Sequence, residues 1–316
     1  MRVQGIILIS LVLSACHKTD LENQIIRAYE DIHINTKHKD AFLYFTDPHI
    51  SPNDASFNNY INTLHHYYSE SSTEFCLCGG DWLNNMDTQV EAKDKLRAIN
   101  SVTTNIFDNR FYHVLGNHDT NYQGRLNESS VKNTGQFSQA DIIELLYPKQ
   151  RQSFFSFKTN ESKFIILDTG IDWDYNIDNL RLTQINWFAN ELQNNEKNHI
   201  VILLHIYTND LINPHPFSEK IMNISEAFNY KLKYSINDKT YDFKYSTGKI
   251  ACFICGHCHI DFVDNNTSIP VVGTSHLKDG EIPTFDLCLI DWDKNTLNMI
   301  RVGTGYSRVI NLAEYD

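Results

Sequence analysis

The sequence predicts an α/β fold, and three patterns carry the prediction. From Ala41 onward, short apolar runs that end in Asp, Gly, Asn or His alternate with longer segments of helical period, as in βαβ units. The short runs are almost continuous in Val, Ile, Leu and Phe, which is typical of strands covered on both faces. After Ile269 the helical segments stop, so we expect the chain to end in antiparallel hairpins.

The predicted elements follow from these runs in order. Buried strands are predicted at 41–46, 74–78, 111–115, 163–167, 200–204 and 250–255. Helices are predicted at 56–69, 88–101, 138–146 and 182–194, and the terminal hairpins use the run from Ile269, 285–292 and 296–302. Ligands of open α/β sheets gather at the carboxyl ends of the strands, so a site is expected there.

The composition excludes several classes of protein. With 316 residues, 41% hydrophobic and 21% charged, the chain resembles ordinary globular domains and not disordered, collagen-like or coiled-coil sequences. A formal charge of -12 has the wrong sign for tracking nucleic-acid phosphates, so no specific duplex nucleic-acid partner is expected. A mean hydropathy of -0.39 excludes a multi-pass membrane protein.

The N-terminus predicts export. Arg2 precedes an apolar run, Ile6 to Leu13, that is too short to span a bilayer. Leu13-Ser14-Ala15-Cys16 resembles a bacterial lipobox, which implies cleavage before Cys16 and attachment of lipid to its thiol; a plain signal peptide is the alternative. We therefore expect an extracytoplasmic protein that is lipid-anchored to a bacterial membrane and contacts the membrane only through that anchor.

Four segments follow from this interpretation. Residues 1–15 are expected to be a lipoprotein signal peptide, 16–39 a tether with at most a short helix, 40–302 the main domain, and 303–316 a C-terminal tail.

The domain also holds six cysteines, most of them in apolar runs, where buried free thiols are favoured over disulfides. The spacing of Cys252, Cys255 and Cys258 would suit a metal cluster, but strand alternation sends Cys252 and Cys255 to opposite faces.

Five of the six predicted buried strands end in side chains that bind metals. They are Asp47-Pro48-His49, Gly79-Gly80-Asp81, Gly116-Asn117-His118-Asp119, His205 and Gly256-His257-Cys258-His259. Each has an ordinary alternative explanation, such as a helix cap, a polar loop or a core histidine. Five such coincidences among six strand ends are not expected, so the pattern indicates a metal site.

In this order the five blocks resemble the motifs of the calcineurin-like metallophosphoesterase family, over about residues 41–302. The motifs of that family are D-x-H, G-D, G-N-H-[D/E], H and G-H-x-H. The resemblance implies a four-layer sandwich of two mixed β-sheets flanked by helices. It also implies two metal ions that share Asp81. One would be held by Asp47, His49, Asp81 and His259, and the other by Asp81, Asn117, His205 and His257.

The residue types suit phosphoester chemistry. Water clamped between two ions about 3.5–4 Å apart has a pKa near 7, which provides a nucleophile at neutral pH. Imidazole, carboxylate and amide ligands without thiolate suit Mn, Fe, Zn or Co. Two divalent ions against Asp47 and Asp81 leave the site about +2, so the acidic surface does not oppose a phosphate there.

His118 is the predicted general acid, because it adjoins Asn117 and a histidine suits proton donation to a leaving oxygen. Asp119 has two interpretations: it orients His118, or it is a loop carboxylate or helix cap. His113 and His276 are expected to be ordinary packing residues, although His276 follows a turn that could approach the site. Asp172 and Asp174 are expected to be solvated loop charges.

The sequence thus predicts hydrolysis of a phosphomonoester or phosphodiester, on a small molecule or a lipid headgroup, by a metal-bridging hydroxide with His118 as acid. Two alternatives stay open: a catalytically silent scaffold or binding lipoprotein of the same fold, and a metal-dependent binder of glycan or nucleotide. The residues do not distinguish among the substrates that one dinuclear core could serve.

Overall fold

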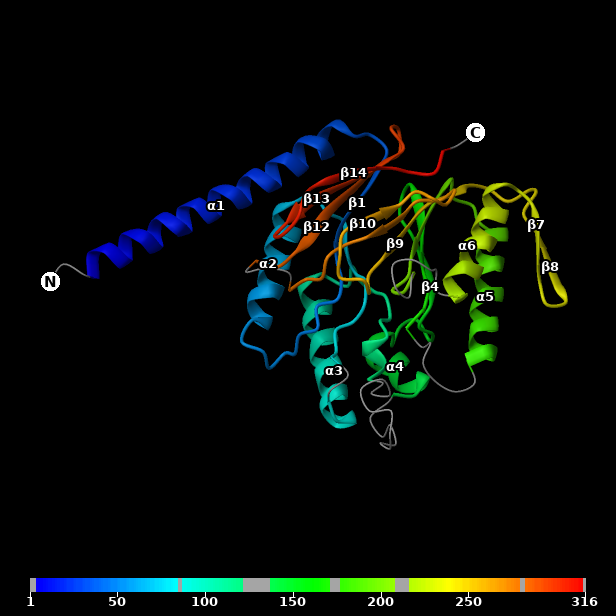
Figure 1. The fold of residues 1–316 in the computed structure, drawn as a ribbon, viewed down its shortest axis with the longest axis horizontal. Helices are drawn as coiled ribbons and strands as arrows, with labels where there is room; N and C mark the ends of the chain where they lie inside the picture. The colour runs from blue at the N-terminus through cyan, green and yellow to red at the C-terminus, as the bar shows by residue number, and fades with distance from the viewer. Residues whose placement is uncertain are drawn as a thin grey trace.

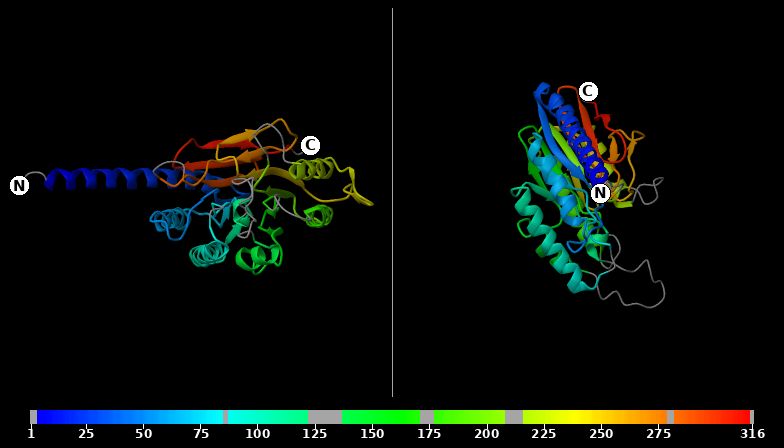
Figure 2. Two further views of the ribbon diagram at one scale, coloured as in Figure 1. Left: turned by 60° about the horizontal axis from the view of Figure 1, so that its bottom comes forward. Right: turned by 90° about the vertical axis from the view of Figure 1, so that its left-hand side faces the viewer.

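Two six-stranded mixed sheets form the centre of the molecule (Figures 1 and 2). The computed structural model describes residues 4–84, 87–121, 137–170, 177–207, 216–278 and 282–314. The first sheet has the order β14-β13-β12-β1-β2-β3 and the second β10-β11-β9-β6-β5-β4. Helices lie on both sides of the pair of sheets (Figure 1), so the predicted α/β sandwich is confirmed.

The bounds of the elements are as follows. The first sheet contains β1 (Lys39–Phe45), β2 (Phe75–Cys78), β3 (Phe111–His113), β12 (Phe285–Asp291), β13 (Thr296–Val302) and β14 (Arg308–Asn311). The second contains β4 (Phe155–Lys158), β5 (Ser162–Ile166), β6 (His199–Leu203), β9 (Lys249–Cys255), β10 (Phe262–Asp264) and β11 (Val271–Gly273). A separate hairpin consists of β7 (Lys233–Ile236) and β8 (Lys239–Asp242). The helices are α1 (Gln4–Asn35), α2 (Phe57–Glu70), α3 (Gln89–Ile106), α4 (Gln139–Leu146), α5 (Ile177–Gln193) and α6 (Pro216–Asn229).

Two apolar cores hold the layers together. One lies between the sheets and under α2 and α3, whose amphipathic faces bury residues such as Leu64 and Leu96. The other lies between the second sheet and α5 and α6, with Phe188 and Phe228 fully buried. Strands of the second sheet thus contact apolar side chains on both faces, as their continuous apolar sequences predict.

The strand directions bring several loops to one edge. β1, β2 and β3 are parallel neighbours, and β5, β6 and β9 are parallel neighbours in the other sheet. Phe45 at the end of β1 lies opposite Cys78 at the end of β2, so the segments that follow leave the first sheet at the same level. The five motif blocks therefore emerge close together.

The N-terminal boundary of the domain differs from the sequence-based expectation. Residues 16–39 are not a tether throughout, because α1 continues to Asn35 and its last turns pack on the first sheet. Tyr29 is fully buried, and its hydroxyl donates to the Cys288 carbonyl at 3.4 Å. Ile25, Ile26 and Ile32 pack on the same core, which gives the helix an apolar stripe of period 3.6. Among the described residues, no helix is long and apolar enough to cross a bilayer.

The C-terminal boundary is also corrected. Residues 303–316 are not simply a tail, since β14 adds an edge strand beside β13, and Ile310 and Leu312 are buried. A strand of four residues gives little signal by itself, so the pairing depends on the sheet that receives it. The cysteine prediction is confirmed at five positions, where the thiols are buried and free: Cys76, Cys78, Cys252, Cys255 and Cys288.

Candidate metal centre

Two buried carboxylates form the centre of the candidate site. Asp47 follows β1 and Asp81 follows β2, and backbone hydrogen bonds join their loops: Asp47 N–H donates to the Gly80 carbonyl at 2.9 Å, and His49 N–H to the Asp81 carbonyl at 3.0 Å. Both side chains are almost completely shielded from solvent. A pair of buried charges requires compensating partners, so their surroundings decide what they can do.

Each carboxylate uses one oxygen for the fold and directs the other at imidazoles. Asp47 Oδ2 accepts from the Thr46 hydroxyl at 2.6 Å and from His257 N–H at 2.9 Å, while Oδ1 lies 3.1 Å from His259 Nε2. Asp81 Oδ1 accepts from His118 N–H at 2.7 Å, while Oδ2 lies 3.1 Å from His205 Nε2. The remaining oxygens therefore face a shared space.

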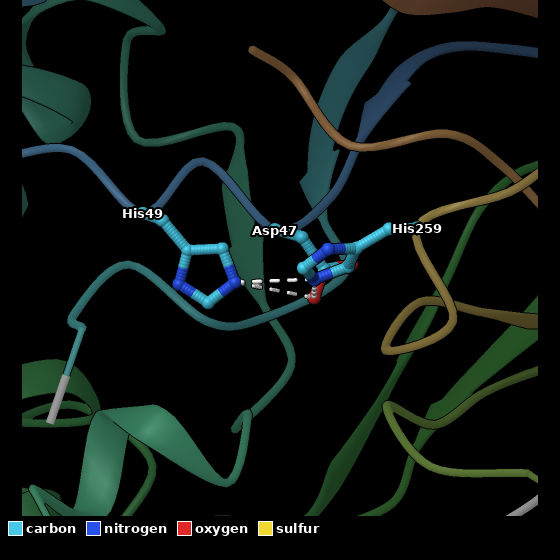
Figure 3. Close-up of side chains that lie close together, drawn as sticks. All are labelled: Asp47, His49 and His259. Atoms are coloured by element: carbon cyan, nitrogen blue, oxygen red, sulfur yellow. Dashed lines mark hydrogen bonds and ion pairs between the residues drawn. The ribbon is translucent and has the colours of Figure 1, made fainter. Parts of the chain in front are cut away.

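Three overlapping groups of metal-binding atoms surround that space. In each group the atoms lie within 4.8 Å of one another. The groups are Asp47, His49 and His259; His49, Asp81 and His118; and Asp81, His205 and His257. Figure 3 shows the rings of His49 and His259 directed toward the Asp47 carboxylate. Asn117 joins the third group, since its Oδ1 lies 3.2 Å from His205 Nε2. The structure thus brings all seven predicted ligands together.

The outer contacts of two histidines fit metal binding. His49 Nδ1 lies 2.8 Å from the Leu83 carbonyl, and His205 Nδ1 lies 2.7 Å from the Gly79 carbonyl. A ring nitrogen next to a carbonyl carries the proton, so in the neutral ring the lone pair of Nε2 is directed into the site. The second contact of a ligating histidine usually takes this form, and the donor set therefore fits bound cations.

The charges of the site also favour a cation. Burial alone lowers the pKa of the His205 imidazole, but the carboxylates of Asp81 and Asp47 raise it to about 10. Burial alone likewise raises the pKa of both carboxyls, but His205 holds both below their usual range. Burial and the neighbouring His205 lower the pKa of His257 to about 4. Without metal, a proton on His205 balances the carboxylates, and a metal ion would compete for that position.

The backbone at the site adopts conformations that L-residues rarely occupy. Asp47, His49, Asp81, His257 and His259 have φ values of 50°, 43°, 63°, 70° and 57°. His257 is the centre of a tight turn in which Cys258 N–H donates to the Gly256 carbonyl at 2.8 Å. A side chain at Gly116 would overlap the Asp81 carboxylate, which explains the glycine there.

His118 lies at the open face of the site. Its ring packs edge-on against His49 with centroids 4.8 Å apart, and its Nε2 lies 3.9 Å from Asp81 Oδ2. The side chain is 33% exposed, whereas Asp81 is 1% exposed. Nδ1 is buried and has no hydrogen-bond partner among the described residues. One edge of the ring therefore faces the ligand cluster where solvent or a substrate can reach it.

The hydrogen bonds of Asp119 go to backbone N–H groups and not to the His118 ring, so they give no support to an orienting role. Its Oδ1 accepts from the N–H groups of Trp82 and Leu83 at 2.7 and 3.3 Å, and its Oδ2 from those of Asp81 and Gly116 at 2.9 and 3.0 Å. The short 3₁₀ helix His118–Thr120 turns neighbouring side chains in different directions. Asp119 is the loop carboxylate of the second interpretation, and it joins two ligand-bearing loops.

Comparison with known proteins agrees with this architecture. Residues 41–261 match the sequence model of the family described as Calcineurin-like phosphoesterase. The chain belongs to the calcineurin-like phosphoesterase family. A search of curated proteins found no match.

Solved structures share the phosphoesterase fold at low sequence identity. A dimetal phosphatase from Danio rerio is 12% identical with a TM-score of 0.61, over 86% of this chain and 98% of that chain. GAP50, described as the anchor in the inner membrane complex of Plasmodium, is 11% identical with a TM-score of 0.51, over 88% of this chain and 90% of that chain. At such identities the likeness establishes the fold alone.

Two neighbours of this candidate site were not predicted as site residues, although the turn before His276 was expected to be able to approach it. The His276 ring stacks on the His259 ring, with centroids 4.9 Å apart and planes inclined by 16°, and the Lys278 ammonium donates to the His49 carbonyl. Their position after Gly273-Thr274-Ser275, at the end of a strand, is the one signal that could have indicated them. Asp172 and Asp174 lie outside the described residues.

Proposed function

We propose that this protein is a dinuclear metal-dependent phosphoesterase that hydrolyses a phosphomonoester or a phosphodiester. One observation carries the proposal: two buried carboxylates each keep one oxygen facing a common space that five imidazole rings also surround. A folded core does not require this arrangement, because buried charges destabilise unless they are compensated. The dinuclear chemistry of the family accounts for it.

The proposed ligands divide between two positions. Asp47, His49, Asp81 and His259 would hold one ion, and Asp81, Asn117, His205 and His257 the other, with Mn, Fe, Zn or Co as candidates. Two such ions would supply an activated water and positive charge against the phosphate. The protein contributes the fixed ligand positions, since hydrogen bonds to both carboxylates leave little freedom in the loops.

His118 is proposed to donate a proton to the leaving oxygen. Its backbone N–H is held by Asp81 Oδ1, so the ring stays beside the shared ligand while one edge remains accessible. The substrate would be a small-molecule phosphoester or a lipid headgroup. We also propose that the chain is lipid-anchored through Cys16 and extracytoplasmic, as the lipobox implies.

The test separates metal binding from turnover. Wild type, Asp81→Asn, His118→Asn and the control His66→Asn, which alters an exposed side chain of α2, would be reconstituted with Mn²⁺. Metal content and hydrolysis of chromogenic phosphomonoesters and phosphodiesters would be measured. We expect Asp81→Asn to lose metal and activity together. His118→Asn should keep metal and lose about 10²- to 10⁴-fold in kcat.

The silent scaffold of the same fold makes the opposite prediction. GAP50 is described as an anchor, so the fold by itself does not decide between catalysis and scaffolding. The presence here of every expected ligand together with His118 favours catalysis. Metal binding without hydrolysis of any substrate in a broad phosphoester panel would support the scaffold, and activity that survives chelation and both substitutions would refute the proposal.

A further inference from the structure

Four imidazole rings form a continuous row across the site. His118 contacts His49 with centroids 4.8 Å apart, His49 contacts His259 at 5.1 Å, and His259 contacts His276 at 4.9 Å. The first two contacts are edge-on, whereas His276 and His259 are nearly parallel. His276 ends the row on the side opposite His118, so it is a direct neighbour of the proposed ligands.

His259 differs from two other proposed histidine ligands in how its ring is fixed. Carbonyl groups hold Nδ1 of His49 and of His205. For the His259 ring, the hydrogen bonds found within the described part of the chain involve only Nε2, which faces the site. The side chain is also 40% exposed and its φ is 57°, so surrounding contacts cover the ring only in part and its backbone is not relaxed. The parallel His276 ring covers one face of it.

The segment that carries His276 is itself firmly attached. We call residues 274–278 the strap. Its Ser275 N–H donates to Asp261 Oδ1 at 3.0 Å, beside the loop that carries His259. Its Leu277 N–H donates to the Thr46 carbonyl at 3.0 Å, next to Asp47, and Lys278 donates to the His49 carbonyl. The strap follows β11 of the second sheet and binds the loop after β1 of the first, so it connects both halves of the site.

Buried ion pairs fix the start of the strap. The Thr274 hydroxyl donates to Asp286 Oδ2 at 2.6 Å. The Arg301 guanidinium contacts Asp286 at 2.9 Å and Asp261 at 2.6 Å, and it is 2% exposed. These contacts give His276 a fixed position from which its ring can restrict the partly exposed His259 ring.

From these contacts we infer that His276 is a positioning residue of the metal centre. Its ring stacks on His259 and holds that ligand in the orientation in which Nε2 reaches the site. Carbonyl groups do the same for His49 and His205. The inference rests on the proposed function, because it assigns a role toward the same cations. The role requires a planar ring at position 276 and not a ring nitrogen. Loss of such an outer contact typically lowers metal affinity about 10- to 100-fold.

The experiment compares four variants of the full chain with wild type. His276→Ala removes the ring, His276→Gln keeps a polar side chain without a ring, and His276→Phe keeps a ring without nitrogens. His199→Ala is the matched control, since it removes a ring stacked on Trp292 with centroids 4.0 Å apart at the opposite end of β6 from His205. Co²⁺ affinity would be measured by chelator competition, the coordination geometry by visible absorption, and folding by the Tm of the metal-free chain.

We expect His276→Ala and His276→Gln to bind one of two Co²⁺ ions about 10- to 100-fold more weakly, with an altered visible spectrum. His276→Phe and His199→Ala should bind as wild type does. The inference would be overturned if His276→Gln bound Co²⁺ with wild-type affinity and spectrum. It would also be overturned if His276→Phe were as defective as His276→Gln. Both outcomes can be read even if His276→Ala does not fold. A wild-type chain that binds no Co²⁺ would overturn the proposed function as well, so the two failures are distinguishable.

Discussion

The carboxylate of Asp119 provides the most direct quantitative test of the loop architecture. Four backbone N–H groups, of Asp81, Trp82, Leu83 and Gly116, donate to its two oxygens, and the side chain is completely buried. These N–H groups belong to the loops after β2 and β3, which carry proposed metal ligands. Asp119→Ala removes every one of these acceptors and leaves the four donors inside the protein.

The expected cost follows from those contacts. An unsatisfied buried donor costs about 1–3 kcal/mol. Water can enter the space that the carboxylate leaves and serve some of the donors, so we expect Asp119→Ala to lower the free energy of unfolding by about 4 kcal/mol in total. Asp119→Asn keeps one acceptor oxygen and should cost roughly half as much.

The assay is urea unfolding of the metal-free chain. Asp94→Ala is the control, because Asp94 is exposed on α3 and its ion pair with Arg97 at 3.2 Å is solvated. The midpoint should fall strongly for Asp119→Ala, by an intermediate amount for Asp119→Asn, and little for the control. A wild-type midpoint in Asp119→Ala together with lost hydrolysis would refute the argument, since the carboxylate would then act in the reaction and not in the fold.

Two further predictions concern pH and the membrane anchor. Burial lowers the pKa of His205, but Asp81 and Asp47 raise it to about 10 in the folded chain, against about 6.5 in the unfolded chain. The protonated His205 therefore stabilises the fold fully below pH about 6.5, and this stabilisation is lost as the pH rises through about 10. The Tm of the metal-free chain should therefore decrease over this range more steeply than that of His205→Asn, and parallel curves would contradict the assignment. In a bacterial expression host, metabolic labelling with palmitate should mark the wild-type chain and not Cys16→Ala; label that persists in the variant would rule out the lipobox interpretation.

The fold could be predicted where a segment carries its own signal. β1, β6 and β9 are nearly continuous apolar runs, so their sequences reveal both their type and their burial. β14 and the packed end of α1 were not predicted, because apolar and polar residues are mixed in both and each is stabilised by the sheet on which it packs. The β7–β8 hairpin was missed for a similar reason: three of its eight strand residues are lysine or aspartate exposed to solvent or paired with each other.

The candidate site could be predicted as a set of residues but not as a set of contacts. The order of the motifs indicates Asp47, Asp81 and His205, which the structure brings together. Adjacency in sequence misleads for Asp119, because a single 3₁₀ turn directs its carboxylate away from His118. The contact between His276 and His259 could not be predicted from the sequence, because it forms only where β10 and β11 return the chain to the site.

Backbone strain bears separately on whether the site binds cations. Five of the seven proposed ligands, all of them Asp or His, have φ between 43° and 70°, a region that costs non-glycine residues roughly 1–3 kcal/mol each. Glycine would remove that cost at each position, and a scaffold that no longer bound cations would gain stability from the exchange. The two carboxylates among them are buried and need compensating partners, which His205 supplies in the metal-free chain and which bound cations would supply when the site is loaded. Strain of this kind, gathered at the proposed ligands, is accounted for by cation binding and therefore argues against a scaffold that no longer binds metal ions.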